Sequence, residues 1–442
     1  MGWLRSKNIA SRSLFALAVF VFFWLPVTAS GFYGDSDDRL GLDGSFKILT
    51  SMVDSSRLPV FVREGSADYA LKTVTRLMAD GRPKPWLRYE IHSVFGLVFA
   101  SAGLNLNEPG SVATRYRAFD ADRDLVREPD ASAEILLDRL SARFIFSWAD
   151  LIIGRQAITF GKAYFWNPLD VFLAFDPAQL DRDYKPGVDG FRLDIPVGDF
   201  SGFNLMGIAG RDITSAGTYR NPRRVFDASW YGSSVLGRYY TTVSGWDLAL
   251  QAGKIYGGYQ IGGGVVGELG PLEVRMEAAY FKAETGPQLP FPRQGAIWVD
   301  NLTAVFGLGH RFKNSFTVEA EYLYNGSGDP ENLEASLIRR SHGATLHFGK
   351  HILGVLASYE FLPLLLGQMV WIYSFSDKSS LFQPSLSVSL ADEIDLQLSA
   401  AMGVGQKPAQ GPGSFVFVKS EFGSLPYIYL LELRFFFSLS IR

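Results

Sequence analysis

The sequence predicts an all-β fold: a transmembrane, antiparallel, up-and-down β-barrel of about 18 strands with a long third outer loop. Apolar and polar residues alternate with a period of two over most of the chain, and short turns alternate with long connections. The strand-sized segments are about 10 residues or longer, as a tilted membrane strand requires. Successive side chains of a strand point to opposite faces. A membrane barrel turns the apolar face to lipid and the polar face to a wet lumen.

The first 29 residues predict a secretory signal peptide. Arg5, Lys7 and Arg12 form a basic region, and Leu14–Val27 is a continuous apolar stretch. Val27-Thr28-Ala29 then has the small residues of a cleavage site. The apolar stretch is shorter than the roughly 20 residues of a transmembrane helix. We therefore expect residues 30–442 to form a mature barrel in the bacterial outer membrane.

The barrel strands follow in order, and the alternation is clearest at 139–148, 272–277, 316–322, 395–404 and 429–438. We expect strands near 40–52, 67–78, 86–98, 135–147, 151–160, 188–197, 201–210, 230–243, 246–255, 258–269, 272–283, 298–311, 315–325, 351–360, 366–376, 381–390, 395–404 and 427–439. Single-chain bacterial barrels have an even number of strands. Segment 342–349 could add a strand, so 16 and 20 strands are alternatives. Barrels of 16–18 strands leave an aqueous channel.

The connections alternate in length, which distinguishes a membrane barrel from the alternative, a secreted protein of two β-sandwiches. Short turns are expected at 80–85, 148–151, 197–201, 244–246, 270–272, 313–315, 362–363 and 391–394, and longer connections between most of them. Short periplasmic turns and long outer loops are typical of outer-membrane barrels. Aromatic residues also recur near strand ends, for example Trp86, Trp246 and Tyr429, as in interfacial girdles.

The composition excludes several classes of function. The chain has no Cys, so it can form neither a disulfide nor a covalent haem attachment. Its formal charge is −3, and −6 without the three basic residues of 1–29, whereas a nucleic-acid partner would require a basic surface. His342, His347 and His351 lie close in sequence but without the acids or Cys of a metal site. We therefore expect no enzyme, no cofactor and no metal.

The long connection at 161–187 is the segment most informative about function. Asn167 and Pro168 predict the start of a short helix, and Asp176-Pro177 predicts a turn. The expected constriction-loop residues are Trp166, Asn167, Asp170, Asp176, Asp181, Arg182, Asp183, Lys185 and Asp189. Aromatic side chains of such a loop can pack against a barrel wall, while its charged side chains set a local electric field.

The motifs of this region resemble those of a known group. They are Arg155-Gln156, Trp166-Asn167-Pro168-Leu169-Asp170, Asp176-Pro177, Lys185-Pro186-Gly187-Val188-Asp189 and Arg192. Over about 40 residues the chain resembles the outer-membrane porins related to alginate-export channels. It is similar, too, to the barrel subunits of porin–cytochrome conduits. The resemblance implies that the third outer loop folds into the lumen and narrows it; the alternative is a lid folded on itself.

Charged residues at alternate strand positions are expected to line the lumen. The expected pore-lining residues are Arg88, Arg139, Arg143, Arg155, Arg192, Glu273, Arg275, Glu277, Glu319 and Glu321. The four arginines from 139 to 192 would form a basic strip, opposite an acidic strip of the four glutamates. Charged rings of this kind govern ion selectivity. Alternatively, many of these charges pair across neighbouring strands.

Three functions are compatible with such a barrel. The leading hypothesis is a porin for passive diffusion of small polar or charged solutes. The second is a barrel sheath that holds a periplasmic or extracellular partner protein, such as a multihaem cytochrome, for electron transfer. The third is an outer-membrane hydrolase, in which His310 or His342 would have to meet a nucleophile in space. Outer-membrane lipid is a partner in each case.

Overall fold

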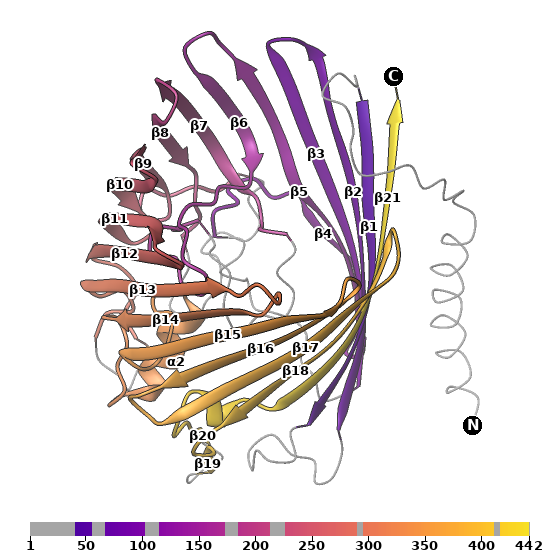
Figure 1. The fold of residues 1–442 in the computed structure, drawn as a ribbon, viewed down its shortest axis with the longest axis vertical. Coiled ribbons are helices and arrows are strands. Elements are labelled where there is room, and N and C mark those ends of the chain that lie inside the picture. Colours follow the sequence, from indigo (N-terminus) through magenta and orange to yellow (C-terminus); the bar gives the residue numbers. More distant parts are fainter. Residues whose placement is uncertain are drawn as a thin grey trace.

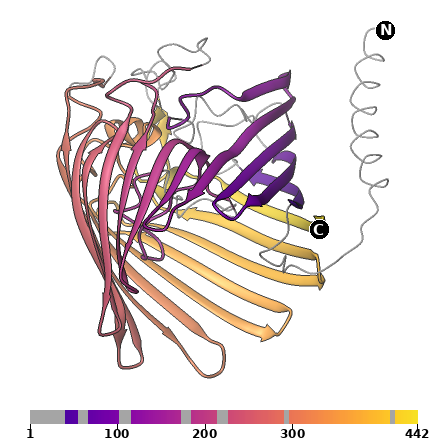
Figure 2. The same ribbon diagram turned by 90° about the horizontal axis from the view of Figure 1, so that it is seen from above.

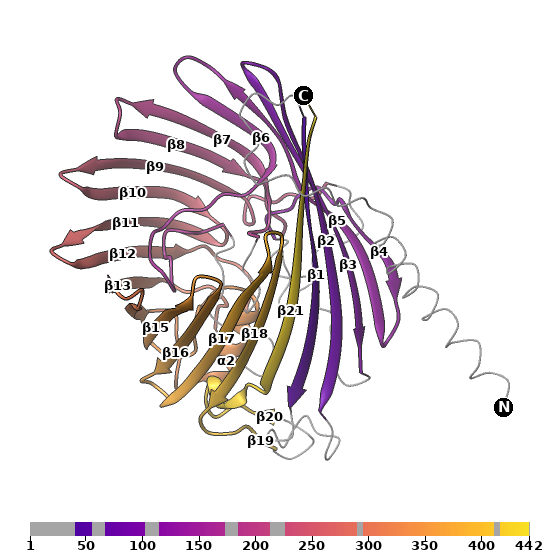
Figure 3. The same cartoon turned by 45° about the vertical axis from the view of Figure 1, so that its right-hand side comes forward.

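The computed structural model describes residues 40–54, 67–101, 115–172, 184–212, 226–289, 295–410 and 416–441. In these residues, 18 antiparallel strands form a closed barrel (Figure 1). The ring closes because β21 pairs with β18 on one side and with β1 on the other, as Figure 3 shows. The predicted signal peptide, residues 1–29, lies outside the described residues.

The barrel strands agree with the expected ones in number and order. They are β1 (Leu40–Asp54), β2 (Asp68–Lys84), β3 (Leu87–Ala100), β5 (Ala131–Ile145), β6 (Asp150–Gln156), β7 (Val188–Val197), β8 (Ser201–Ile208), β9 (Ser234–Val243), β10 (Trp246–Ile255), β11 (Gly258–Leu269), β12 (Leu272–Ala283), β13 (Asn301–Arg311), β14 (Thr317–Asn325), β15 (His351–Leu362), β16 (Leu365–Ser374), β17 (Ser379–Ala391), β18 (Ile394–Val404) and β21 (Tyr427–Ile441). The fold prediction is confirmed, and segment 342–349 forms no strand.

Four shorter elements of the connections were not predicted. They are β4 (Asp122–Arg127), which pairs with β5, the ribbon of β19 (Ala409–Gln410) and β20 (Val416–Phe417), the helix α2 (Leu333–Ser341) and the 3-10 turn η3 (Phe422–Ser424). Helix α2 begins after Asn332, whose side chain accepts a hydrogen bond from the Ala335 backbone N–H. In the described part of the chain, no helix is long and apolar enough to cross a membrane.

Short turns gather at one end of the barrel, which we call the turn end, and the long connections gather at the other, the loop end (Figure 2). The β9–β10 turn shows the local cause, because Ser244 and Gly245 have φ values of 51° and 80°. Two central residues with positive φ form the turn whose twist matches a β-hairpin. Leu40 pairs with Ile441 at the turn end, so the barrel begins and finishes there.

The outward face of the wall is apolar, as the alternation predicts. In β12, Met276 and Tyr280 point outward and are 44% and 45% exposed, whereas Arg275 and Glu277 point inward and are 7% and 3% exposed. Large exposed apolar residues recur around the ring, among them Leu77, Phe203, Leu250, Ile261, Leu398 and Leu431. An outward apolar band of this kind faces lipid in outer-membrane barrels.

The inward face differs from the simple alternation rule, because much of it is apolar beneath the long connections. One cluster packs Tyr116, Ile158 and Phe172 of the connections against wall residues such as Met206 and Phe281. A second cluster packs Phe165, Trp166 and Phe422 against wall residues such as Leu323, Ile352 and Ile372. Segments that fold into the lumen bury apolar surface on both sides, so the charged lumen is confined to part of the wall.

Candidate functional site

The described part of the third loop, residues 157–172, crosses the lumen from β6 to the opposite wall. The carboxylate of Glu321 on β14 accepts hydrogen bonds from the backbone N–H groups of Phe165, at 2.7 Å, and Trp166, at 3.4 Å, and also from that of Tyr164. Glu321 is 1% exposed. Since carboxylates form charge-assisted hydrogen bonds to backbone N–H groups, one glutamate fixes three consecutive residues of the loop.

A second glutamate holds the next part of the loop. Glu277 on β12 accepts from the backbone N–H groups of Lys162, at 2.6 Å, and Leu169, at 3.4 Å. The Gln251 side-chain amide on β10 donates to the Leu169 carbonyl at 2.9 Å. The Gln251 contact takes a carbonyl that a helix would use as an acceptor, and the described residues 168–172 form turns and no helix. The predicted turn at Asp176-Pro177 lies outside the described residues.

The base of the loop is held by a buried ionic network around Asp138. Arg76, Arg117 and Arg139 donate to its carboxylate at 2.7, 2.6 and 2.9 Å, and the Gly187 N–H donates at 3.1 Å. Asp138 and its neighbour Arg139 both point inward because the β3–β5 register shifts by one residue at this point. Such a β-bulge redirects a side chain that regular alternation would send outward.

Two further ion pairs lie at the base of the loop, one between the strands that flank it and one between its own two ends. Arg155 on β6 donates to both carboxylate oxygens of Asp189, at 2.6 and 3.0 Å, and to the Leu137 carbonyl at 2.7 Å. The Lys185 ammonium contacts the Asp170 carboxylate and donates to the Thr159 hydroxyl at 2.9 Å. Burial raises the pKa of Asp170 and lowers the pKa of Lys185, and the attraction between the two charges opposes both shifts.

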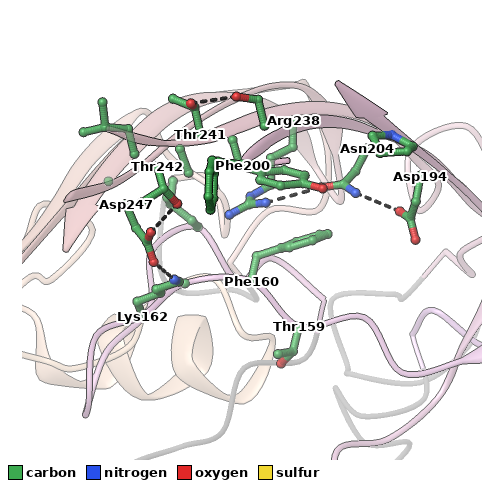
Figure 4. Close-up of a pocket in the computed structure, with 18 of the residues that line it drawn as sticks. Thr159, Phe160, Lys162, Asp194, Phe200, Asn204, Arg238, Thr241, Thr242 and Asp247 are labelled. Carbon is green, nitrogen blue, oxygen red and sulfur yellow. Dashed lines mark hydrogen bonds and ion pairs between the residues drawn. The ribbon is translucent and has the colours of Figure 1, made fainter. Parts of the chain in front are cut away.

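The lumen keeps a cavity of about 800 Å³ between this loop and the wall, toward the turn end. Figure 4 shows that its lining combines aromatic rings with charges of both signs: Lys162 and Phe160 project from the loop, Arg238 from β9, and Asp194 and Asp247 lie beside them. Lys162 pairs with Asp247. Arg143 and Arg192, also in the lining, pair with Asp150 and Asp194 at 3.1 and 2.9 Å.

Arg238 is bound differently from the other cations of the cavity. It donates to the Asn204 side-chain oxygen at 3.3 Å and forms no ion pair with any residue that the structure describes. Its guanidinium carbon lies 4.9 Å from the ring centre of Phe160 and 5.5 Å from that of Tyr240. Cation–π contacts of this kind hold a guanidinium without neutralising its charge.

The expected pore-lining residues therefore fall into three groups. Arg143 and Arg192 line the cavity, with Arg88 directly across from Arg143 in the β3–β5 register. Arg139, Glu277 and Glu321 hold the loop, and Arg155 joins the two strands that flank it. Glu273, Arg275 and Glu319 form a network in which Arg275 donates to Glu273 at 2.9 Å and to Glu319 at 2.7 Å, and Arg275 also lies 3.9 Å from the Glu321 carboxylate.

Five of the nine expected constriction-loop residues lie in the part of the chain that the structure describes. Trp166 is buried, Asp170 pairs with Lys185, Asp189 pairs with Arg155, and the Asn167 carbonyl accepts from the Asp170 N–H at 2.9 Å. Asp176, Asp181, Arg182 and Asp183 lie outside the described residues. The sequence reasoning missed Arg238, Lys162 and Asp138. For Arg238 a signal existed, because it alternates with Gly237 and Tyr239 along its strand and shares one face with Tyr240.

The three clustered histidines have separate environments. His342 lies at the end of α2, His347 contacts Trp166 and Glu421, and His351 contacts the Tyr322 hydroxyl. Among the described residues, no group of three His, Cys, Asp or Glu side chains could hold a metal ion.

No protein-family model and no curated protein matches the chain. Solved structures do. OccAB2 of Acinetobacter baumannii superposes with a TM-score of 0.56 at 10% identity, over 92% of this chain and 100% of that one. Pseudomonas aeruginosa OpdK with vanillate gives 0.51 at 12% identity, over 90% and 99%. Pseudomonas aeruginosa OccK2 (OpdF) in complex with glucuronate gives 0.51 at 9% identity, over 93% and 100%.

These comparisons leave the likeness of the loop motifs to alginate-export porins and conduit barrels as a prediction. OpdK itself is described as an outer membrane protein. The chain has the fold of these outer-membrane porins, a closed antiparallel barrel of 18 strands.

Proposed function

We propose that this barrel is an outer-membrane channel for passive diffusion of small polar or charged solutes, and that it favours small carboxylates. The cavity of about 800 Å³ lined by Arg143, Arg192, Arg238 and Lys162 carries the proposal. Ligand sites for small molecules have volumes of roughly 300–1,000 Å³. The loop narrows the lumen around this cavity, so selection acts through width and through the local electric field.

Arg238 is the residue that favours a carboxylate. Its guanidinium has no described carboxylate partner, whereas Arg143, Arg192 and Lys162 each have one. A planar guanidinium matches a carboxylate with two parallel hydrogen bonds. The Phe160 and Tyr240 rings beside it offer an apolar surface to the body of the solute. Vanillate and glucuronate, the ligands of the two porins named above, are both small carboxylates.

The packing of the loops argues against a sheath around a partner protein. A multihaem cytochrome would have to occupy the lumen, but residues 115–119, 157–172 and 418–425 pack against its inner wall in buried clusters. A cavity of about 800 Å³ holds a small solute and not a folded protein. A partner that docks outside the lumen stays a prediction.

Reconstitution in planar lipid bilayers tests the channel. We expect stepwise, ohmic conductance with a preference for anions. A protein that is folded, as its heat-modifiable mobility on gels would show, and yet silent would contradict the proposal.

The Arg238→Gln variant tests the carboxylate preference. A unit charge 5 Å from a carboxylate in water contributes about 0.8 kcal/mol, equivalent to about a fourfold change. We therefore expect the permeability ratio of glucuronate or benzoate to potassium to fall about fourfold. Arg127→Gln is the matched control, because its side chain on β4 is 66% exposed and does not line the cavity. An equal effect of both variants, or none, would refute the role of Arg238.

A further inference from the structure

His347 links the third loop to two other connections through both nitrogens of its ring. The Trp166 indole Nε1–H donates to His347 Nε2 at 2.9 Å, and His347 Nδ1 lies 2.7 Å from a carboxylate oxygen of Glu421. An indole nitrogen can only donate, and an ionised carboxylate can only accept. Nε2 must therefore carry a lone pair and Nδ1 a proton. The two partners select one neutral tautomer of His347.

The three hydrogen-bonded side chains Trp166, His347 and Glu421 are shielded from water. Trp166, His347 and Glu421 are each 1% exposed. The Trp166 ring centre lies 5.6 Å from the imidazole, and the Phe422 ring centre lies 6.0 Å from it on another side. Glu421 accepts a further hydrogen bond from the Phe348 N–H at 2.9 Å. A change in the hydrogen bonding of His347 therefore cannot be compensated by solvent without movement of the chain.

Among the described residues, Glu421 is the carboxylate that contacts the His347 ring, and it is shared with a second cation. Arg340 of α2 donates to the same Glu421 oxygen at 2.8 Å, so the carboxylate already neutralises one cation. Asp377 accepts from the Glu421 backbone N–H at 2.6 Å, and Glu321 accepts from the backbone of residues 164–166. Both of these carboxylates are engaged with backbone groups rather than with the imidazole.

A second proton on His347 reverses the role of Nε2. The nitrogen becomes a donor and then faces the Trp166 N–H, another donor, across 2.9 Å. Two donors cannot share a hydrogen bond, and a buried donor without a partner is unfavourable. The Trp166 side chain can relieve this only by leaving its site. Because the Trp166 backbone is one of the three N–H donors on Glu321, its displacement loosens the part of the loop that crosses the lumen.

We propose that His347 is an acid-sensitive latch that positions the third loop, holding Trp166 when singly protonated and releasing it when doubly protonated. This inference rests on the channel proposed above and adds a regulated loop to it. The latch joins residues 166, 347 and 421, so the loop is seated by two other connections in addition to the wall.

Single-channel recordings between pH 8 and pH 5 test the latch. We expect wild-type channels to gate about tenfold more often at the acid end, since 1.4 kcal/mol is a factor of ten in the seated population. His347→Gln should stay quiet throughout, because its amide can accept from Trp166 and donate to Glu421 but does not titrate. Trp166→Phe should gate often at every pH. His310→Gln, which changes a histidine at the turn end that contacts the Pro271 carbonyl, should keep the wild-type response.

Thiol labelling, which does not depend on ion conductance, tests the latch separately from the proposed channel function. The chain has no Cys, so an Ala163→Cys substitution adds a single thiol beside Trp166. We expect maleimide labelling at pH 6 to be several-fold faster with His347 than in the His347→Gln background, and equal in both at pH 8. Equal rates at both pH values would overturn the latch even if the channel conducts. Absence of conductance with the expected labelling would overturn the channel and leave the latch supported.

Discussion

Glu321 is the residue on which the position of the third loop depends most, and Glu321→Gln is the sharpest test of that role. Its carboxylate accepts three backbone N–H groups of residues 164–166. At roughly 1.5 kcal/mol for each charge-assisted bond, the three contribute about 4 kcal/mol. The substitution keeps one oxygen but turns an N–H₂ group toward the donors on the other side. Relief of the buried charge offsets part of the loss, so we expect a net cost of about 2–4 kcal/mol in seating the loop.

Planar-bilayer recordings measure this cost directly. A loop that leaves its site in part of the population should give a larger mean conductance and frequent transitions between levels. Glu319→Gln is the control on the same strand, since Glu319 pairs with Arg275 and contacts no described loop residue. Heat-modifiable mobility should show both variants folded as barrels. Recordings of Glu321→Gln that match those of the wild type, or of the control, would refute the assignment of Glu321 as the loop anchor.

Three further predictions concern the same lumen. Gly354→Ala should destabilise the protein by about 1–3 kcal/mol in urea titrations, since a Cβ there would lie 2.9 Å from the Phe165 and Trp166 rings. A gain in stability, as expected when Gly in an open strand is replaced, would contradict the packing of these two rings against Gly354. Arg155→Met should cost about 2–3 kcal/mol in the same titration, because it leaves the largely buried Asp189 with the Phe119 N–H but without its charged partner; an effect below about 1 kcal/mol would count against this pair. His347, Arg340 and the Phe348 N–H hold the pKa of Glu421 below its ordinary 4.5 despite burial, which alone would raise it. The ionised Glu421 carboxylate therefore contributes its full stabilisation above pH 4.5, and this stabilisation is lost as the pH falls through the lowered pKa. Glu421→Gln should remove the corresponding acid-dependent step from a curve of unfolding free energy against pH.

The strands and turns could be predicted from local pattern. The range 188–197 and the run from 246 to 283 were predicted with the ends that the structure shows, because a two-residue turn and a strict period of two are local properties. The loop end was predicted less well. Helix α2 and β4 lie in connections whose own periodicity is weak. Residues 168–172 form turns where a helix was predicted, and Gln251 of the distant strand β10 binds the Leu169 carbonyl there.

The assignment of the lumen charges shows the same division between local and distant causes. Alternation correctly turned Arg143, Glu277 and Glu321 inward, but it could not distinguish a charge that faces solute from one that holds a loop. Phe165 and Glu321 are 156 positions apart in the chain, and only closure of the barrel brings them to 2.7 Å. The bulge at Asp138 likewise reverses the alternation by one residue.

The sequence by itself therefore determined the barrel, the order of its strands and its turn end, because strand periodicity and turn chemistry act between near neighbours. Only the tertiary structure decided which charged residues remain available to a solute. That choice depends on contacts across the lumen, where Glu277 and Glu321 bind the loop backbone and Arg238 donates to Asn204 and lies against two aromatic rings. Burial then changes the energetics of each group, because a charge that has found its partners inside the barrel no longer contributes to the field that a solute meets.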